Sequence, residues 1–383
     1  MRDQRLDKLA KVIVEYSAGV KAGQLVRLRG DPVGLPLLEA LYEAVLKAGG
    51  FPYLNCTPDS LAEIFYEHAN ETQLKYVNPV SQHEIETIDV SISLWAETNT
   101  KSLSRVDPKR QGIASAARKP IFKVFMERAA REKSDPRRLT WCGTLYPTLA
   151  SAQDAEMSLK QYEDFVFRAG HLDKADPVAE WRRIEAQQQK VVDYLTGKKM
   201  LRFQTAAGTD LRVNVEGMRW INCAGHENFP DGEVFTGPNL KAADGGVNGV
   251  VRYSFPAVHN GREVHDIELT FEKGRVVKAK ASKNEDFLIE MLDMDAGARN
   301  LGEIAIGTNY SITEYSKNTL FDEKIGGTFH AAVGAGYPES GNSNESGLHW
   351  DMVCDLRRGG TIAVDGEVIS RDGRFVFPGW PGN

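Results

Sequence analysis

The sequence predicts a fold in two parts: an α/β N-terminal lobe followed by a mostly antiparallel, β-rich C-terminal domain. In the first part, the amphipathic helix pattern "PLLEALYEAVLKAGG" lies between the strand patterns "GQLVRLRG" and "FPYLNC". Alternation of this kind predicts a mainly parallel sheet with flanking helices. After residue 198, strand–turn–strand patterns such as "ELTFEKGRVVKAKA" and "TIAVDGEVISRDGRFV" predict antiparallel hairpins.

A helical segment is predicted to connect the two parts. The pattern "DPVAEWRRIEAQQQKVVDYLTG" places Asp176 as a helix N-cap, Pro177 at the first helical position and Gly197 at the end. One more helix pattern, "NEDFLIEMLDM", interrupts the strands of the second half, which gives that half an α+β class. We therefore expect an α/β domain over 1–150, a helical connector over 151–197 and a β-rich domain over 198–383.

Composition narrows the class of protein. The chain has 383 residues, and 47 Lys+Arg against 53 Asp+Glu give a net charge of -6, which argues against a nucleic-acid-binding surface. No apolar run approaches the roughly 18 residues of a membrane helix, and the N-terminal stretch is charged. The four cysteines show no C-x-x-C spacing and read as reduced thiols. We expect a cytoplasmic protein with no nucleic-acid or membrane partner.

The stretch "GLHWDMVCD", residues 347–355, contains the first pattern that suggests chemistry. His349 and Asp351 are two residues apart, so on a strand both side chains point to the same face. Such a pair is a set of metal ligands, an acid/base pair or an ordinary buried hydrogen bond. More residues of metal-binding type recur beside tight turns in the same half of the chain: Glu233, Glu303, Glu323, His330 and Tyr337.

Taken singly, each of these residues has an ordinary structural explanation. A carboxylate after a glycine turn, such as Glu233, is usually solvated, and a lone histidine such as His330 is usually a hydrogen-bonded core residue. The collection is harder to explain structurally. A mixed Glu/Asp/His set without thiolates is typical of a catalytic metal site. Five or six ligands are too many for one ion with an open position, and they fit two ions that share a carboxylate.

The remaining histidines of the second half join this set less readily. His226 and Glu227 precede the "FPDGE" turn and are candidates for an outer layer around the site. His259 and His265 flank the turn of "HNGREVH", and we expect them to be exposed hairpin residues.

Several segments, in order, resemble a known family. They are "KLAKVIVEYSAGVKAGQLVRLRG", "YPTLASAQDAEMS", "GEVFTGP", "GEIAIGTN", "NTLFDEKIGGTFHAAVGAGYPE" and "HWD". The chain thereby resembles the aminopeptidase T, aminopeptidase S and PepS-type dinuclear metallo-aminopeptidases, over most of its length. Compared with that family, the loop from Glu323 to His330 looks longer and the segment from Tyr337 to His349 looks shorter, which bears on pocket shape and substrate preference.

Carried over residue by residue, the resemblance implies six metal ligands: Glu233, Glu303, Glu323, His330, His349 and Asp351. Glu303 is the candidate to bridge the two ions. It places Tyr337 at the metal site, either as a ligand or as a hydrogen-bond donor to the developing oxyanion. Tyr337 and Glu303 are the candidate catalytic residues. The resemblance also implies two divalent ions per subunit (Zn, Co, Mn or Mg), a cytoplasmic homodimer, and short peptides with a free N-terminus as substrates.

The sequence therefore favours a metal-dependent aminopeptidase that uses a water activated between two ions. An alternative on the same fold is a ring-cleaving dioxygenase similar to the dihydroxypyridine dioxygenases, in which His330, His349 and Asp351 hold one Fe(II). A third hypothesis is a non-enzymatic peptide-binding or metal-stabilised protein. The additional glutamates favour hydrolysis over the dioxygenase, and the complete set of candidate ligands argues against a non-enzymatic protein.

Overall fold

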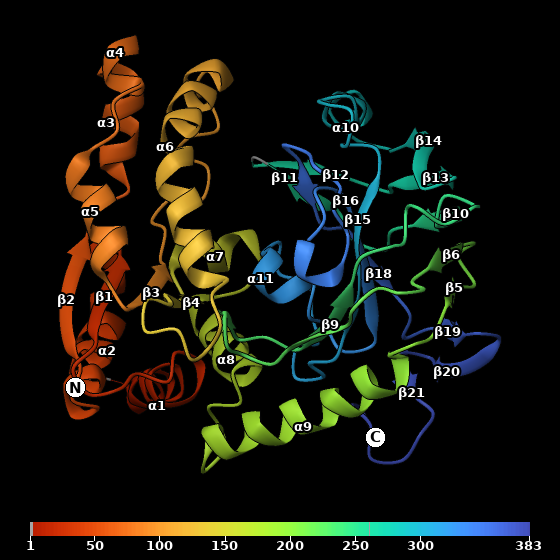
Figure 1. Cartoon of the computed structure of the whole chain (residues 1–383), viewed down its shortest axis with the longest axis horizontal. Coiled ribbons are helices and arrows are strands. Elements are labelled where there is room, and N and C mark those ends of the chain that lie inside the picture. Colours follow the sequence, from red (N-terminus) through yellow and green to blue (C-terminus); the bar gives the residue numbers. More distant parts are fainter. Residues whose placement is uncertain (1–2, 260) are drawn as a thin grey trace. The chain divides into compact units, whose positions relative to one another are not determined.

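The computed structural model of the chain describes residues 3–259 and 261–383 (Figure 1). By its internal contacts the chain divides into two compact units. The N-terminal unit comprises Met1–Val178 together with Gly225–Phe229, and the C-terminal unit comprises Ala179–Ala224 together with Pro230–Asn383. The predicted fold class, α/β followed by mostly antiparallel β, is confirmed.

A five-stranded parallel sheet of order β2-β1-β3-β4-β8 forms the centre of the N-terminal unit. Its strands are β1 (Leu25–Gly30), β2 (Phe51–Cys56), β3 (Val90–Trp95), β4 (Thr140–Leu145) and β8 (Asn228–Phe229). Strand β2 lies on one side of β1, and β3 lies on the other side. The order in which strands are added to the sheet therefore reverses at the boundary between β1 and β3.

Helices cover this sheet, as the alternating pattern predicts. They are α1 (Gln4–Val12), the π-helix η1 (Ile13–Ser17), the 3₁₀ helix η2 (Pro32–Gly34), α2 (Leu35–Lys47), α3 (Ser60–His68), α4 (Glu71–Leu74), α5 (Pro79–Thr87), α6 (Pro108–Ala129), α7 (Leu149–Asp154) and α8 (Leu159–Ala169). Helix α2 packs on β1 and β2, and α5 packs against α6. At the start of α8, Ser158 and Gln161 form a capping box, which satisfies two backbone N–H groups.

One face of the parallel sheet carries a buried ion pair. Arg27 on β1 donates to Glu84 of α5 at 2.7 Å and to Ser91 Oγ of β3 at 2.8 Å. Glu84 also accepts hydrogen bonds from Tyr53 Oη at 2.9 Å and from Asn55 Nδ2 at 3.0 Å. Burial alone would raise the pKa of Glu84, but the hydrogen bonds from Asn55 and Arg27 hold it below its usual value.

The C-terminal unit contains two larger antiparallel sheets and one hairpin (Figure 1). The eight-stranded sheet has the order β14-β13-β10-β6-β5-β19-β20-β21. Its strands are β5 (Met200–Gln204), β6 (Asp210–Asn214), β10 (Val247–Arg252), β13 (Glu268–Glu272), β14 (Arg275–Lys280), β19 (Thr361–Val364), β20 (Glu367–Arg371) and β21 (Arg374–Phe375). The hairpin pairs β11 (Ala257–His259) with β12 (Arg262–Val264).

The six-stranded sheet has the order β17-β16-β15-β9-β7, and β18 also pairs with β16. Its strands are β7 (Ile221–Cys223), β9 (Glu233–Thr236), β15 (Leu301–Gly307), β16 (Thr328–Gly334), β17 (His349–Trp350) and β18 (Val353–Asp355). The helices of this unit are α9 (Pro177–Leu195, which begins in the N-terminal unit), α10 (Glu285–Leu292), α11 (Thr319–Asp322) and the 3₁₀ helix η3 (Pro338–Ser340).

The two faces of the six-stranded sheet differ in chemistry. Phe329 of β16, Ile304 of β15 and Val234 of β9 belong to the hydrophobic core of the C-terminal unit. Phe329 stacks on Phe203 of β5 with ring centroids 4.3 Å apart, which joins the two sheets. Because side chains alternate along a strand, the neighbours of these residues must lie on the opposite face.

None of the helices in the described ranges combines the length and the apolar character that crossing a bilayer requires.

Glu84→Gln is expected to destabilise the N-terminal unit, because it leaves the buried Arg27 without its charge partner. We expect the free energy of unfolding at pH 7 to fall by about 3 kcal/mol. Since the folded-state pKa of Glu84 is lowered, its contribution is fully present above the unfolded-state pKa and is lost as the pH falls through the folded-state value.

Urea denaturation of both proteins across the pH range tests this expectation, and the difference should shrink below about pH 4. Glu63→Gln, at an exposed position of α3, is the matched control and should change stability by less than about 0.5 kcal/mol. A difference between wild type and Glu84→Gln that does not depend on pH would contradict the ion-pair explanation.

Candidate metal centre

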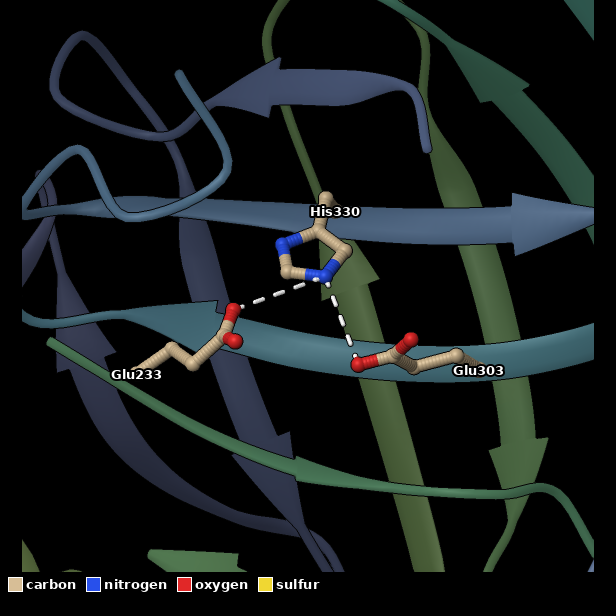
Figure 2. A group of neighbouring side chains, drawn as sticks. All are labelled: Glu233, Glu303 and His330. Atoms are coloured by element: carbon tan, nitrogen blue, oxygen red, sulfur yellow. Dashed lines mark ion pairs between the residues drawn. The ribbon is translucent and has the colours of Figure 1, made fainter. Parts of the chain in front are cut away.

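The register of three neighbouring strands brings three of the predicted metal ligands, Glu233, Glu303 and His330, together on the sheet face opposite the core. On β15, Glu303, Ala305 and Gly307 alternate with the core residues. His330 of β16 lies opposite Ala305, and Glu233 of β9 lies opposite Gly307. The small residues at these two positions leave room for the imidazole and the carboxylate, and Figure 2 shows both carboxylates directed at the His330 ring.

The His349–Asp351 pair joins the same face from the sheet edge. His349 of β17 lies opposite Gly334 at the end of β16, on the same side as His330. Gly334 has a φ of +103°, and a Cβ placed there would approach the Leu348 carbonyl oxygen to 2.1 Å. A glycine is therefore needed for β17 to pair closely enough with β16 to deliver its histidine.

Two histidines and three carboxylates make up the centre of the site. His330 Nε2 lies 3.6 Å from Glu233 Oε2, 3.5 Å from Glu303 Oε1 and 3.8 Å from Asp351 Oδ1. His349 Nε2 lies 3.3 Å from Glu303 Oε2 and 3.4 Å from Asp351 Oδ1. Glu303 thus presents a different carboxylate oxygen to each histidine.

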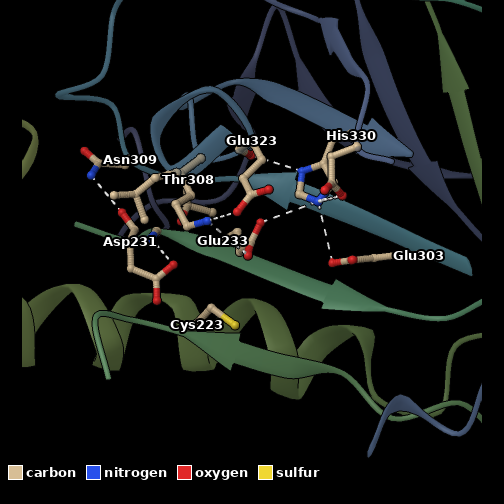
Figure 3. A network of polar contacts seen from close by, with 12 residues as sticks. Cys223, Asp231, Glu233, Glu303, Thr308, Asn309, Glu323 and His330 are labelled. Atoms are coloured by element: carbon tan, nitrogen blue, oxygen red, sulfur yellow. Dashed lines mark hydrogen bonds and ion pairs between the residues drawn. The ribbon is translucent and has the colours of Figure 1, made fainter. Parts of the chain in front are cut away.

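Potential ligand atoms fall into three overlapping groups, each within 4.8 Å: Glu233, Glu303 and His330; Glu303, His349 and Asp351; Glu323, His330 and Asp351. Glu303, His330 and Asp351 each belong to two groups. The six residues predicted from the sequence as ligands are therefore brought together in one place, and Figure 3 labels Glu233, Glu303, Glu323 and His330 among them.

Backbone carbonyls orient both histidines. The Nδ1–H of His330 donates to the Glu323 carbonyl at 3.1 Å, and the Nδ1–H of His349 donates to the Ala335 carbonyl at 2.8 Å. Each ring therefore turns Nε2 toward the carboxylates. A histidine held in this way is pre-oriented to ligate through Nε2, because the second nitrogen fixes the tautomer and the ring direction.

A lysine that the sequence analysis did not single out lies among the carboxylates. Lys324 is fully buried, donates to the Glu323 carboxylate, and places Nζ 3.7 Å from Glu233 Oε1. A fully buried lysine is rare unless it is paired. The available signal was its position directly after Glu323 and before the apolar stretch that contains His330.

The charges of the site are strongly coupled. Burial raises the pKa of Glu233 well above its usual value. Burial alone would also raise the pKa of Glu303, but hydrogen bonds from His330 and His349 bring that pKa below the usual value. Burial lowers the affinity of each imidazole for a proton, yet the carboxylates outweigh it and raise the pKa of His330 to about 10 and that of His349 to about 12. The carboxylates thus hold cations in place, whether protons or metal ions.

Glu233 supplies a direct test of whether a metal fits this site. Its Oε2 atom is buried, and within the part of the chain that the structure describes it has no hydrogen-bond partner. A buried carboxylate oxygen without a partner is costly. Lys324 pairs with two of the four carboxylates, Glu233 and Glu323, and the two histidines lie among the others. The residues present therefore fit a divalent cation, and their oxygen and nitrogen donors suit a catalytic rather than a closed structural ion.

Comparison with known proteins agrees with this chemistry. A family model described as thermophilic metalloprotease (M29) matches residues 2–375. The chain belongs to the M29 family of metalloproteases.

Individual relatives and solved structures are similar to the chain over most of its length. The chain is 30% identical to "Aminopeptidase 2" of Geobacillus stearothermophilus over 98% of both chains. The solved structure of wild-type AmpT from Thermus thermophilus superposes with a TM-score of 0.83 at 25% identity, covering 98% of this chain and 99% of that one. A 2,5-dihydroxypyridine dioxygenase from Pseudomonas putida KT2440 shares the fold at a TM-score of 0.59 and 14% identity, over 97% of both chains.

The resemblance predicted from the sequence is thus confirmed, as is the enzyme class. The chain is a metallopeptidase of the M29 family, and its curated relatives are named aminopeptidases. The likeness to the dioxygenase extends to the fold alone.

Tyr337 stands at the edge of the cluster. Its hydroxyl oxygen lies 3.5 Å from His349 Nε2, and its ring packs against Phe235 of β9 with centroids 5.3 Å apart. Burial and the nearby carboxylates, Glu303 first among them, raise the pKa of Tyr337, so the phenol stays protonated and remains a hydrogen-bond donor.

Helix α9 supports the site from behind β9. The Gln188 side chain, fully buried, donates to the backbone carbonyl of Glu233 at 3.0 Å and to that of Cys223 at 2.9 Å. Its amide oxygen accepts from Thr308 Oγ1 at 3.0 Å. Gln188 thereby fixes the backbone from which the Glu233 carboxylate projects.

The other histidines of the second half lie elsewhere. His226 belongs to the N-terminal unit, where its ring stacks on Tyr16 with centroids 4.7 Å apart. His265 pairs with Glu263 at 3.1 Å. The prediction that His259 is exposed was wrong. Its ring packs against the ring of Trp350 with centroids 5.1 Å apart, and Trp350 is the residue between His349 and Asp351.

Gly334→Ala is expected to weaken zinc binding by about 10-fold or more, because it displaces β17 and with it the predicted ligand His349. Isothermal titration of the chelator-treated protein with zinc measures the change. Gly366→Ala is the matched control, since it also has a positive φ, of +90°, but no neighbour within 4 Å of the added Cβ. Both variants carry a similar backbone strain of about 1–2 kcal/mol. Equal zinc affinity in the two would contradict the role assigned to Gly334.

Proposed function

We propose that this chain removes N-terminal residues from short peptides, using a water molecule activated between two divalent metal ions. The observation that carries the proposal is the position of Glu303, whose two carboxylate oxygens face the Nε2 atoms of His330 and His349 at 3.5 and 3.3 Å. A carboxylate shared between two ligand groups is suited to bridge two ions in a two-ion site.

The residues that would hold the ions follow from the groups above. Glu233, Glu303 and His330 would form one site, and Glu303, His349 and Asp351 the other, with Glu323 within reach of His330 and Asp351. These donors suit Zn, Co, Mn or Mg. When bound, ions at such sites lower the pKa of a water molecule and polarise a carbonyl group.

The remaining chemistry belongs to side chains of the chain. Tyr337, protonated and directed at the cluster, is suited to donate a hydrogen bond to the carbonyl oxygen as negative charge develops there. Glu303 or Glu233 is suited to carry the proton of the attacking water to the leaving amine. Lys324 holds the carboxylates of Glu323 and Glu233 in place through its charge.

We also propose a cytoplasmic homodimer that does not bind nucleic acid or membranes. None of the four cysteines, all of which the structure describes, forms a disulfide, which suits a reducing compartment, and the net charge of -6 disfavours nucleic acid. Strand β2 is an edge strand whose Phe51 is 63% exposed and whose Leu54 is 43% exposed. An apolar edge of this kind favours burial against another copy.

The free amino group of the substrate is the feature to test first. The protein is stripped of metal, Zn, Co, Mn, Mg or Fe(II) is added back separately, and leucine release is followed from a leucyl dipeptide and its N-acetylated form. We expect metal-restored cleavage of the free-amine peptide only. Cleavage of both peptides would argue for an endopeptidase, and no cleavage with any metal would argue against peptide hydrolysis.

The dioxygenase alternative uses a subset of the same residues. His330 and His349 lie 3.8 and 3.4 Å from Asp351, which is a possible arrangement for one Fe(II). Glu233 and Glu323 have no role in that chemistry, and their presence favours hydrolysis. Oxygen consumption with Fe(II) and a dihydroxylated aromatic ring, without peptide cleavage, would support the alternative.

Glu303→Gln is expected to lower kcat/KM for the leucyl dipeptide by more than about 100-fold, because even the loss of a partner outside the ligand sphere costs 10- to 100-fold. Its circular dichroism should match that of the wild type. Glu272→Gln, exposed on β13 of the same unit, is the control and should keep full activity. Full activity in Glu303→Gln would remove Glu303 from the mechanism.

A further inference from the structure

The N-terminal unit contains a cavity that the metal centre does not explain. It has a volume of about 570 Å³ and is lined by residues of β1, β2, β3, α5 and α6 and of the segment before α5. This volume falls within the range of about 300–1,000 Å³ that is typical of small-molecule sites.

Polar side chains of β1, β2 and β3 form two rows across the sheet, and Arg27, Arg29, Asn55 and Ser93 of these rows line the cavity. In the parallel register Arg27 lies beside Tyr53 and Ser91, and Arg29 lies beside Asn55 and Ser93. Adjacent residues in a parallel register point to the same face. Strands in a parallel sheet are normally apolar on both faces, so a polar face is unusual and calls for a reason.

Positive charge exceeds negative charge in the cavity. Arg27, Arg29 and Arg118 line it together with a single carboxylate, Glu84. Glu84 is already engaged by Arg27, Tyr53 and Asn55. Partial burial, followed by repulsion from Arg27, lowers the pKa of Arg29, which shows that the guanidinium groups lie in one another's field.

Donors in the cavity also lack acceptors. Arg27 is 6% exposed, and its buried Nε has no hydrogen-bond partner within the described ranges. The side chain of Arg29 is exposed and makes no hydrogen bond or ion pair with any residue that the structure describes, so it is open to a ligand. Among the described residues, the exposed Arg118 side chain donates to the Ala114 carbonyl at 3.2 Å and to the Tyr66 hydroxyl at 3.3 Å. Arg29 and Arg118 are therefore the guanidinium groups of the cavity that an anionic ligand can reach.

The location of the cavity supports binding as well. It includes Arg29, Asn55, Thr57 and Ser93, which lie toward or just beyond the carboxyl ends of β1, β2 and β3. The order of strands reverses between β1 and β3. In open α/β sheets, ligands bind outside the carboxyl ends of the strands at such a reversal.

The rest of the lining includes an apolar and aromatic wall, to which α6 contributes next to Arg118. Phe122 of α6 is 64% exposed, and Tyr76 is 67% exposed, while Ile121 and Phe125 line the cavity more deeply. Large aromatic side chains with this exposure on a cavity wall are suited to pack against a ring or an aliphatic chain.

We propose that this cavity binds a small organic anion, a phosphate ester or a carboxylate, that carries an aromatic or aliphatic group. The anionic end pairs with Arg29 and Arg118, since guanidinium groups recognise both phosphate and carboxylate through paired hydrogen bonds. The apolar end packs on Phe122 and Tyr76. The site lies within the N-terminal unit and does not depend on peptide hydrolysis.

Calorimetric titration of the full chain with phenyl phosphate and with 3-phenylpropionate tests the proposal and distinguishes the two anion types. We expect at least one of them to bind with a Kd of about 100 µM or tighter. Arg29→Gln should weaken that binding about tenfold or more, while leaving thermal stability unchanged or raised because a like-charge repulsion is removed. Arg105→Gln, at an exposed position of the same unit, should bind as the wild type does.

Two further variants locate the ligand. Phe122→Ala should weaken binding of the organic anion but not that of inorganic phosphate. Glu303→Gln should leave binding unchanged, which excludes an anion held at the metal centre. Absence of binding by both organic anions up to about 5 mM, equal affinity in wild type and Arg29→Gln, or loss of binding in Glu303→Gln alone would each overturn the proposal.

Discussion

The C-terminal unit is organised around four closely spaced carboxylates: Glu233 and Glu303 are buried on one face of the six-stranded sheet, and the partly buried Asp351 and Glu323 follow β17 and α11. Buried carboxylates are tolerated only when cations or hydrogen-bond donors surround them. Lys324, His330 and His349 supply that compensation within the chain, and an orphaned oxygen of Glu233 remains. The fold therefore holds an excess of negative charge in a fixed geometry, and a metal ion that binds there replaces protons on the histidines.

Strand alternation makes this arrangement possible. The same three strands give Phe329, Ile304 and Val234 to the hydrophobic core and place Glu303 and His330 on the other face. A slip of one residue in register would exchange the two faces, so core packing and site geometry enforce the same register. The glycine and alanine opposite Glu233 and His330 belong to this constraint, because larger side chains would fill the space above the sheet.

Much of the candidate metal centre could be predicted from the sequence, and the residues that were not predicted were missed for physical reasons. The H-x-D spacing predicted that His349 and Asp351 share a face, because period two is a local property of any strand. Glu233 and His330 were assembled through family resemblance, since no local pattern reveals which distant strands pair. Lys324 was missed because a lysine beside a glutamate usually indicates a solvated surface, and only tertiary burial changes that meaning. The polar face of β1 was missed although "LVRLRG" alternates, because the segment was taken only as a strand.

Every residue of the candidate metal centre lies in the C-terminal unit, and every residue of the arginine-lined cavity lies in the N-terminal unit. The two sets share no side chain and no strand. Substitutions that change the arginine-lined cavity can therefore accumulate while the metal centre stays intact, and the reverse also holds. A chain built in this way can acquire a new small-molecule response, or lose one, while its hydrolytic chemistry is inherited intact.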